Sequence, residues 1–562
     1  MNYIEKATKW KNFKGLDSKL REQLMQMSDA ELKEAFTEDL EFGTGGMRGI
    51  LGPGTNRMNY YVVRKATLGF ANYLIKKFPN ERSIAISYDN RHYSKEFAFD
   101  CADLLSSLDF NVYVFEDLRA TPELSFAVRY YKCKAGIMIT ASHNPKEYNG
   151  YKIYDEDGCQ LIPSLASQVI DEINAIEDIF SVSIKPKKKL IHKIGLEVDK
   201  AYMEKVNTIR INKDLPINFS VVFTPLHGTG GVLGPQILEN NGFKVYPVEA
   251  QMVHDPDFGA VKSSNPENKE AFDEAIQLGL EKKAKLVLAN DPDADRLGMG
   301  CYHNGSYILL NGNQSATIMT HYICSELKRQ GKLPNNGYLF TTNVSSDLPV
   351  KIATSFGLKY YITLTGFKFI GEQAKRIEGG IGTYIYGFEE SYGCLIKDFV
   401  RDKDAMQAIL MICEIEAFLE QKGMDLIDYL EKIYQEYGYS LETQSNIYLQ
   451  GLDGKEKIKK IMNHFRENEV FLKYGNIVRK EDNLNQIAYD YLEKNIATSK
   501  IELPKSNVMK YFFEDGSFFV LRPSGTEPKL KVYYSTKGQT MNEAEKNNQA
   551  LMNEVMKLVN AI

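Results

Sequence analysis

The chain repeats one order of elements three times: strand, helix, strand, helix, strand, and then a loop rich in polar side chains. The repeats run from SIAISYDNR to TASHNPKEYNG, from FSVVFTPLHGTGG to LANDPDADR, and from YLFTTNVSSD to GFEESYG. Such strand–helix–strand units form right-handed crossovers, because parallel strands need a connection of about a dozen or more residues. The sequence therefore predicts three successive α/β domains of similar topology with parallel or mixed sheets.

A fourth domain follows these repeats. A chain of 562 residues is too long for one hydrophobic core. After the third repeat the sequence becomes strongly helical, and it ends with two strand-like runs around RPSGTEP, which indicates a C-terminal α+β domain. We expect four domains, with bounds at 1–205, 206–312, 313–440 and 441–562.

The composition excludes several classes of protein. Hydrophobic residues make up 43% of the chain and the net charge is -5, so nothing attracts it generally to nucleic acid or to an anionic membrane. No segment approaches the roughly 18 apolar residues of a membrane span, and the N-terminus lacks a signal-peptide pattern. Seven scattered cysteines without a CxxC pair argue against disulfides and zinc sites. We expect a cytoplasmic protein.

Ser142 is the first candidate for chemistry. It follows the apolar run at 135–139 and lies beside His143 in a loop that Pro145 keeps out of regular structure. A loop at the carboxyl end of a parallel strand is where ligands bind in α/β sheets. Alone, the pattern fits a turn or a helix cap as well as a nucleophile.

Three aspartates give the sharpest signal. Asp291, Asp293 and Asp295 alternate directly after the apolar strand KLVLAN. Oxygen ligands at this spacing suit Mg²⁺ or Ca²⁺, and a bound cation removes the repulsion between the carboxylates. Arg296 and Tyr302 stand where a calcium-binding EF-hand needs glycine and glutamate, so that site is excluded. The remaining alternative is a solvated acidic turn.

The loop after the third repeat can bind a polyol. Glu389 and Ser391 in GFEESYG can exchange hydrogen bonds with sugar hydroxyls, although the same residues also fit a helix-capping box. Arg401 and Lys403 bring positive charge towards this region. A lysine whose pKa is lowered by burial or by cationic neighbours can act as a base, whereas most lysines lie at the surface.

Two further loops bear on anion binding. FGTGGMRG carries Arg48 where the dinucleotide-binding pattern GxGxxG needs its third glycine, and the chain has no Walker A sequence, so nucleotide binding is not supported. RPSGTEP combines the Arg522 guanidinium with two hydroxyls and a glycine, which together can form a phosphate cradle.

Together these loops resemble the α-D-phosphohexomutase superfamily. FGTGGMRG, TASHNPKEYNG, DPDADR, GFEESYG and RPSGTEP occur in the family's order and cover nearly the whole chain. TLTGFKFIG at 363–371 and the GFEES form are similar to the phosphoglucomutase and phosphopentomutase branch. The GEMSG-like loop typical of phosphomannomutases is absent. The resemblance implies four domains around a central cleft.

The resemblance also implies a role for each matching residue. Ser142 would carry a phosphoryl group and, with Asp291, Asp293 and Asp295, bind one Mg²⁺. Arg296 would be a further active-site cation. The residues expected to surround the phosphoserine and assist proton transfer are Arg48, His143, Lys152 and Lys403. The residues expected to hold the sugar are Thr365, Gly366, Glu389 and Ser391. Those expected to bind the non-reacting phosphate are Arg522, Ser524, Gly525 and Thr526.

The implied reaction interconverts glucose 1-phosphate and glucose 6-phosphate through the phosphoserine and a glucose 1,6-bisphosphate intermediate, which is also the expected activator. Small-molecule sugar phosphates would be the partners of a monomer or homodimer. Alternatives are phosphopentomutase or phosphomannomutase activity, a sugar 1,6-bisphosphate synthase, or a non-catalytic sugar-phosphate-binding protein. The sequence departs from the family pattern in two places. No asparagine follows Ser524, and Pro292 and Ala294 stand between the aspartates where glycines are common.

Overall fold

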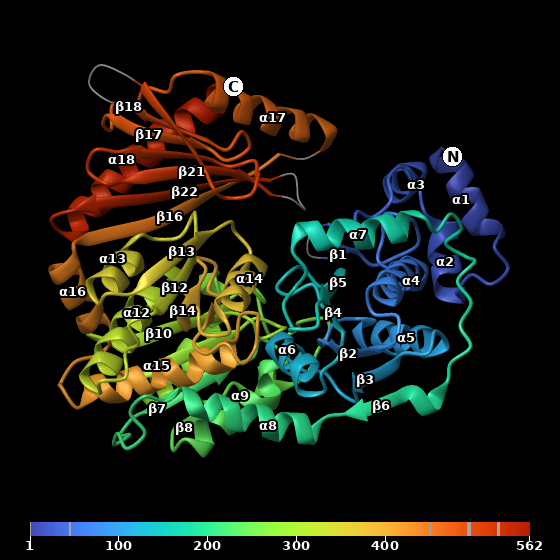
Figure 1. Cartoon of the computed structure of the whole chain (residues 1–562), viewed down its shortest axis with the longest axis horizontal. Helices are drawn as coiled ribbons and strands as arrows, with labels where there is room; N and C mark the ends of the chain where they lie inside the picture. Colours follow the sequence, from blue (N-terminus) through green and yellow to red (C-terminus); the bar gives the residue numbers. More distant parts are fainter. Residues whose placement is uncertain (1, 44–45, 450, 492–495, 525–528) are drawn as a thin grey trace. The chain divides into compact units, whose positions relative to one another are not determined.

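The structure is a computed structural model that describes residues 2–43, 46–449, 451–491, 496–524 and 529–562. Its residues form two compact units. The first comprises Met1–Gly312 with Phe367–Asp425, and the second comprises Asn313–Gly366 with Leu426–Ile562. Figure 1 follows the chain through both.

The first unit begins with a six-stranded mixed sheet in the order β1-β5-β4-β2-β3-β6. Strands β4, β2, β3 and β6 pair in parallel, while β5 pairs antiparallel with β4 and with β1. The strands are β1 (Met47–Ile50), β2 (Ser83–Tyr88), β3 (Asn111–Phe115), β4 (Ala135–Ile139), β5 (Tyr148–Tyr154) and β6 (Ile191–Ile194).

Helices cover both faces of this sheet, with α4 and α5 on one side and α6 on the other (Figure 1). All five residues of β4 are buried, as its central place requires. Helices α1 to α3, which the sequence analysis left unassigned, pack around the buried Trp10. The helices are α1 (Tyr3–Asn12), α2 (Ser18–Gln26), α3 (Asp29–Phe36), α4 (Tyr60–Lys77), α5 (Ser94–Ser107), α6 (Thr121–Tyr130), α7 (Pro163–Asn174) and α8 (Leu196–Val206).

A five-stranded sheet follows in the order β11-β10-β9-β7-β8. Its strands are β7 (Ser220–Thr224), β8 (Lys244–Pro247), β9 (Leu286–Asn290), β10 (Leu297–His303) and β11 (Ser306–Leu310). Its helices are α9 (Gly230–Asn240), α10 (Glu249–Met252) and α11 (Asp273–Lys282). The fully buried strand β9 pairs in parallel with β7, so the loops after both strands emerge at one edge of the sheet.

The remaining part of the first unit comprises α14 (Phe367–Ile377), β14 (Thr383–Phe388), β15 (Cys394–Leu395) and α15 (Ala405–Glu420). Helix α15 packs against α9 and strands β9 and β10. Almost every side chain of α15 is buried, which explains why the sequence from Ala405 onwards is apolar on all sides. This packing brings the turn before α15 to the loop after β9.

The second unit contains a parallel pair, β12 (Gly337–Thr342) and β13 (Lys359–Thr363), with α12 (Gly312–Arg329), α13 (Leu348–Ser355) and α16 (Leu426–Tyr437). It ends in a seven-stranded antiparallel sheet in the order β16-β22-β21-β20-β17-β18-β19. The strands are β16 (Tyr439–Tyr448), β17 (Ile477–Asp482), β18 (Ile487–Tyr491), β19 (Ile496–Lys500), β20 (Met509–Phe513), β21 (Phe518–Pro523) and β22 (Lys529–Gly538).

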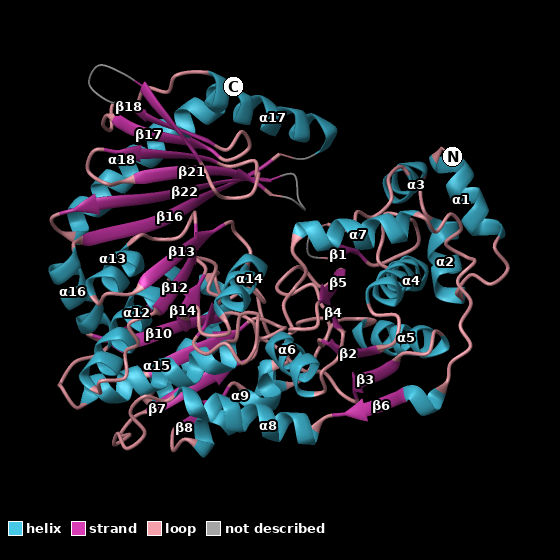
Figure 2. Cartoon of the chain, viewed as in Figure 1, coloured by secondary structure: helices cyan, strands magenta, loops and turns pink. Residues whose placement is uncertain are grey.

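Helices α17 (Gly451–Glu467) and α18 (Met541–Ala561) share one apolar core with one face of this last sheet, where Figure 2 shows them beside its strands. Its other face packs on Val344, just beyond β12. The predicted fold class, three α/β domains followed by an α+β domain, is therefore confirmed. Within the described residues, no helix has the length and apolar character that a bilayer crossing requires.

Candidate active site

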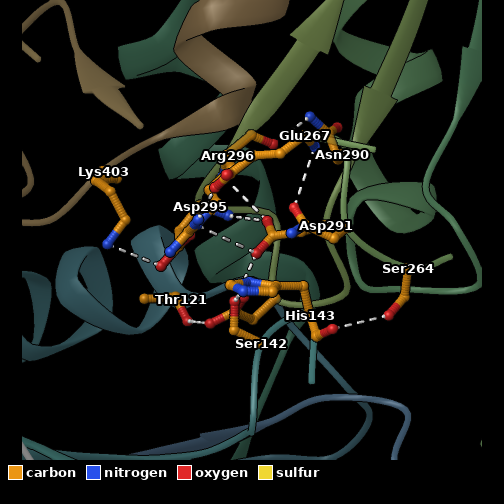
Figure 3. A network of polar contacts seen from close by, with 12 residues as sticks. Thr121, Ser142, His143, Ser264, Glu267, Asn290, Asp291, Asp295, Arg296 and Lys403 are labelled. Atoms are coloured by element: carbon orange, nitrogen blue, oxygen red, sulfur yellow. Dashed lines mark hydrogen bonds and ion pairs between the residues drawn. The ribbon is translucent and has the colours of Figure 1, made fainter. Parts of the chain in front are cut away.

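Ser142 lies in the turn that leaves the carboxyl end of β4. Its backbone has a φ of +52°, in the left-handed region that costs a non-glycine residue about 1–2 kcal/mol. The backbone N–H of Ser142 donates to the hydroxyl of Thr140 at 2.8 Å. This conformation turns the Ser142 hydroxyl towards Asp291, to which it donates at 2.7 Å, with the His143 Nδ1 atom 3.1 Å away (Figure 3).

The three aspartates form one buried cluster after β9. At most 2% of each residue is exposed, and one carboxylate oxygen from each lies within 4.8 Å of the others. The backbone N–H groups of Asp295 and Arg296 donate to Asp291 Oδ1, which fixes that carboxylate. The Oδ1 atoms of Asp293 and Asp295 are buried and have no hydrogen-bond partner among the described residues. Unpaired hard oxygens in this arrangement fit a divalent cation such as Mg²⁺.

The loop around the aspartates is shaped by close packing. Thr229, in the loop after β7, donates to the carbonyl of Pro292 through both its N–H and its hydroxyl. A Cβ atom at Gly228 would come within 2.3 Å of the Pro292 Cα atom, so only glycine fits there. Pro292 therefore forms part of a tight contact between the loops that follow β7 and β9.

Three cations surround the carboxylates. Lys152 on β5 donates to Asp293 at 2.8 Å and lies 3.6 Å from Asp295. The Lys403 Nζ atom lies 3.1 Å from Asp295. Arg296 lies 3.7 Å from Asp295 and pairs with Glu267. The distances between these residues along the sequence do not predict such contacts, because the loops meet only through the packing of β5, β9 and α15.

The electrostatics of the cluster is that of a crowded anionic pocket. Burial raises the pKa of Asp291, and the charges of Asp293 and Asp295 raise it further. Burial also acts against ionisation of Asp293, but Lys152 outweighs it and holds the pKa of Asp293 below its usual range. Burial alone would lower the pKa of Lys152, whereas Asp293 and Asp295 raise it above its ordinary value. Lys152 is therefore a permanent cation.

Lys403 does not have the lowered pKa that would favour its acting as a base. Burial does act in that direction, but the carboxylates of Asp295, Asp402 and Glu389 outweigh it and raise the pKa above its ordinary value. Arg401 is also misplaced by the sequence argument. Its buried guanidinium pairs with Asp398 and Glu378, and no contact with the aspartate cluster is found among the described residues.

His143 and Arg48 also lie close to Ser142 and its loop. Burial lowers the pKa of His143 well below its ordinary value, and the positive charges of Arg296 and Arg48 lower it further, so this imidazole is neutral at pH 7. The Arg48 guanidinium, on β1, donates to the Asn144 side chain at 2.6 Å. Both residues therefore contact the serine loop, as their positions in the motifs indicated.

The polyol-binding candidates lie near the same cations. Glu389 follows β14 and is 4% exposed, and its negative charge acts on Lys403 and on Arg296. The N–H of Glu389 donates to the carbonyl of Gly393 at 2.9 Å, which closes the turn that contains the half-buried Ser391. The turn therefore brings a carboxylate and a hydroxyl to the region of Lys403.

Six other predicted residues belong to the second unit, and four of them lie within the described residues. Thr365 and Gly366 follow β13; the Thr365 hydroxyl is buried without a hydrogen-bond partner in the described part of the chain, and Gly366 has a φ of +118°. Arg522 lies near the end of β21 and donates to the Tyr533 hydroxyl at 3.4 Å, and the N–H of Ser524 donates to the carbonyl of Lys529. Gly525 and Thr526 lie outside the described residues.

Sequence reasoning missed several supporting residues. Thr121, at the start of α6, donates its hydroxyl to Asp293 at 3.0 Å and its N–H to the same residue's carbonyl. Glu267 orients Arg296 at 2.7 Å, and Ser264 donates to the carbonyl of His143 (Figure 3). Glu267 and Ser264 come from the segment KSSNPE, whose cluster of polar residues was the only available signal.

Four family models match the chain in order. They describe phosphoglucomutase/phosphomannomutase alpha/beta/alpha domains I, II and III, at residues 39–179, 200–304 and 311–437, and the C-terminal domain at residues 477–548. Together these models cover most of the sequence, including every loop described above.

Individual proteins show the same relationship. A phosphoglucomutase from Staphylococcus aureus (strain MSSA476) is 40% identical over 527 residues, which cover 93% of this chain and 94% of the relative. The structure of parafusin, a phosphoglucomutase from Paramecium, aligns with a TM-score of 0.68 at 19% identity over 93% and 95% of the two chains. An Aspergillus fumigatus N-acetylphosphoglucosamine mutase, solved with GlcNAc-6P and magnesium, aligns with a TM-score of 0.51 at 14% identity over 93% and 96%. The chain belongs to the phosphoglucomutase/phosphomannomutase family.

Proposed function

We propose that this enzyme is a phosphoglucomutase that interconverts glucose 1-phosphate and glucose 6-phosphate through phosphorylated Ser142 and bound glucose 1,6-bisphosphate. The observation that carries the proposal is the Ser142 hydroxyl, held 2.7 Å from Asp291 in a ring of carboxylates and cations. The Staphylococcus aureus phosphoglucomutase supports the choice of sugar. The absence of a phosphomannomutase-type GEMSG loop supports it further.

One Mg²⁺ per chain would be held by Asp291, Asp293, Asp295 and an oxygen on Ser142. Two buried carboxylate oxygens that accept no hydrogen bond from the described residues support this assignment, as does the magnesium in the related Aspergillus fumigatus structure. The ion would neutralise charge on the transferring phosphoryl group, an effect worth several kcal/mol. Lys152, Arg296 and Lys403 keep the carboxylates together and add positive charge around the reacting oxygens.

In the first transfer, the 6-hydroxyl oxygen of glucose 1-phosphate attacks phosphorus as the bond to Ser142 Oγ breaks. The 6-hydroxyl gives up its proton and Ser142 Oγ gains one, so the serine becomes a hydroxyl again. The bisphosphate then reorients. In the second transfer, Ser142 Oγ attacks the 1-phosphate and glucose 6-phosphate leaves. Neutral His143, 3.1 Å from Oγ, is placed to accept the serine proton in this step. Without a bound metal, the carboxylates of Asp295, Asp402 and Glu389 hold the pKa of Lys403 above its ordinary value, so Lys403 is a cation in the free site.

The other residues would bind the parts of the substrate that do not react. Glu389 and Ser391 would hydrogen-bond sugar hydroxyls, and Thr365 and Gly366 would set the orientation of the sugar. Arg522, Ser524, Gly525 and Thr526 would bind the distal phosphate, which carries about -1.5 to -2 charges near pH 7. The paired arginine and hydroxyl chemistry suits a phosphate.

A comparison of substrates tests the proposal. We expect Mg²⁺-dependent turnover of glucose 1-phosphate with a kcat/KM at least about tenfold above those for mannose 1-phosphate and ribose 1-phosphate, because a site that hydrogen-bonds specific hydroxyls rejects analogues that leave its polar groups unpaired. Initial rates with added glucose 1,6-bisphosphate measure this. A preference for ribose or mannose 1-phosphate would assign a different mutase, and binding without conversion would remove the enzymatic role.

Gly393 provides a test of the Lys403 position. A Cβ atom there would lie 2.0 Å from the Lys403 Cδ atom, so Gly393→Ala must displace the lysine from Asp295. We expect kcat to fall about 10²-fold, because a misplacement of about 1 Å in such a site costs this much. Lys403→Met should give a similar loss, and the double variant little more. Full activity of Gly393→Ala would contradict a role for Lys403 in the reaction.

We propose that the enzyme is cytoplasmic and binds only small-molecule sugar phosphates, as a monomer or homodimer. All seven cysteines are free and buried thiols in the described chain, as expected in a reducing compartment.

A further inference from the structure

Arg91 binds backbone carbonyls of the serine loop, residues 142–148, through its guanidinium. It follows β2, and its side chain is fully buried. One terminal nitrogen donates to the carbonyls of Ser142, at 2.6 Å, and Asn144. The other donates to the carbonyls of Pro145, at 2.8 Å, and Tyr148, at 3.1 Å. Four carbonyl groups of one loop therefore share one guanidinium.

This loop needs such a partner. Its carbonyls point into the protein, where each unpaired polar group costs about 1–3 kcal/mol. Ser142 also has the left-handed backbone conformation that turns its hydroxyl to Asp291. Neither requirement is met by the β4 ladder, which ends at Ile139. The planar fork of an arginine can serve several acceptors at fixed angles, whereas a lysine ammonium is a single point charge.

Arg91 is itself held in place before any substrate binds. Its Nε atom lies 3.4 Å from an oxygen of Asp89, and its backbone N–H donates to the same carboxylate at 3.0 Å. Ser94 donates to Asp89 at 2.7 Å, and the Phe258 ring lies 5.1 Å from the guanidinium carbon. The side chain thus has one available geometry, which it imposes on the loop.

We propose that Arg91 is the positioning residue of the nucleophile loop, fixing the carbonyls of residues 142–148 so that the Ser142 hydroxyl faces Asp291. This inference rests on the proposed function, because it assigns Arg91 to the phosphoryl transfer. Arg91 acts through the backbone and leaves the binding of the sugar and the distal phosphate to other residues. Its loss should therefore slow both transfers without weakening substrate binding.

The test is Arg91→Lys, which keeps the charge and removes the fork. We expect kcat for glucose 1-phosphate to fall by about 10²-fold or more, with KM changed less than about threefold. Single-turnover phosphorylation of Ser142 by glucose 1,6-bisphosphate should slow by the same factor. An unchanged kcat would overturn the proposal, as would a loss confined to KM.

Arg64→Lys is the matched control. Arg64 forms a two-pronged ion pair with Asp100 in the same domain, at 2.8 and 2.6 Å, and no contact with the serine loop is found for it among the described residues. It should lower the unfolding temperature while keeping kcat within about twofold. If both variants lower the unfolding temperature equally and both keep kcat, Arg91 serves only folding and the proposal fails.

Ser94→Ala covers the case in which Arg91→Lys does not fold. It removes one hydrogen bond to Asp89 and leaves the guanidinium present, so we expect about a tenfold loss of kcat at constant KM. Full kcat in this variant would overturn the proposal. The proposed function is tested separately on the unaltered enzyme. If that enzyme carries no phosphate on Ser142, the proposed function is wrong. If the Arg91→Lys enzyme is phosphorylated and fully active, only the role of Arg91 is wrong.

Discussion

Ser142→Ala should abolish mutase turnover, with a loss of about 10⁴-fold or more, the scale seen when a nucleophile is removed. Both transfers use the same oxygen, so no residual half-reaction is expected. Incubation with glucose 1,6-bisphosphate labelled with ³²P should mark the unaltered protein and leave the variant unlabelled. The reason is geometric. Ser142 is 3% exposed, and its hydroxyl donates to Asp291. Among the described residues, the other hydroxyl that donates to the aspartate cluster is that of Thr121, which binds Asp293.

Ser167→Ala is the control for this change. Ser167 is an exposed serine on α7 of the same domain, and its hydroxyl donates to the carbonyl of Ser164. It should label and turn over normally. Normal turnover of Ser142→Ala would remove the phosphoserine from the mechanism, and transfer of label to another residue of that variant would move the nucleophile elsewhere.

The fold could be predicted from sequence because its elements carry strong local patterns. Strands β4 and β9 are short apolar runs bounded by polar loops, and both are fully buried. Their loops carry Ser142 and the aspartates, so strand burial and chemistry pointed to the same positions. Helices α1 to α3 lie outside the repeated pattern, and the sequence argument gave them no place.

The supporting residues could not be found in the same way. Thr121 and Glu267 are ordinary polar residues whose importance comes only from Asp293 and Arg296, which lie far away in the sequence. The direction of the pKa shift of Lys403 could not be predicted for a related reason. The charge of Lys403 was visible in the sequence, but two of its three carboxylate neighbours, Asp295 and Glu389, lie on other loops and could not be assigned to it.

Arg401 shows the limit of reasoning from proximity in the sequence. It stands two residues before Lys403, yet its side chain turns to Asp398 and Glu378. The turn before α15 places alternate residues in different surroundings. The domain bounds and the roles of the site residues stay predictions, and the variants described here are the means to test those roles.

Asp291→Asn should cause the second large loss, a fall in kcat of about 10³-fold or more together with loss of the Mg²⁺ response. In the unaltered protein, Mg²⁺ at 100 times its Kd should stabilise the fold by about 2.7 kcal/mol. The asparagine keeps the size of the side chain and an oxygen for the N–H groups of Asp295 and Arg296. It removes the carboxylate charge, so the thermal shift produced by Mg²⁺ should shrink or vanish.

The metal-free variant should show the opposite change. The pKa of Asp291 is raised by burial and by two neighbouring carboxylates, which means that its charge is unfavourable until a cation is present. Removing the charge should therefore raise the unfolding temperature measured in EDTA while activity falls. A residue needed only for folding would lower both quantities. A variant that is more stable without metal but less active shows that the carboxylate charge serves metal binding rather than folding.

Asp482→Asn is the matched control. Asp482 is also a buried carboxylate, paired with Arg466 at 3.2 Å and hydrogen-bonded to the Asn485 side chain at 2.6 Å. Its charge is already compensated, so its loss should lower the unfolding temperature and leave both kcat and the Mg²⁺-induced shift intact. If Asp291→Asn instead retained the full Mg²⁺ shift, the ion would have to bind elsewhere, because one of its three proposed carboxylate ligands would have been removed without effect.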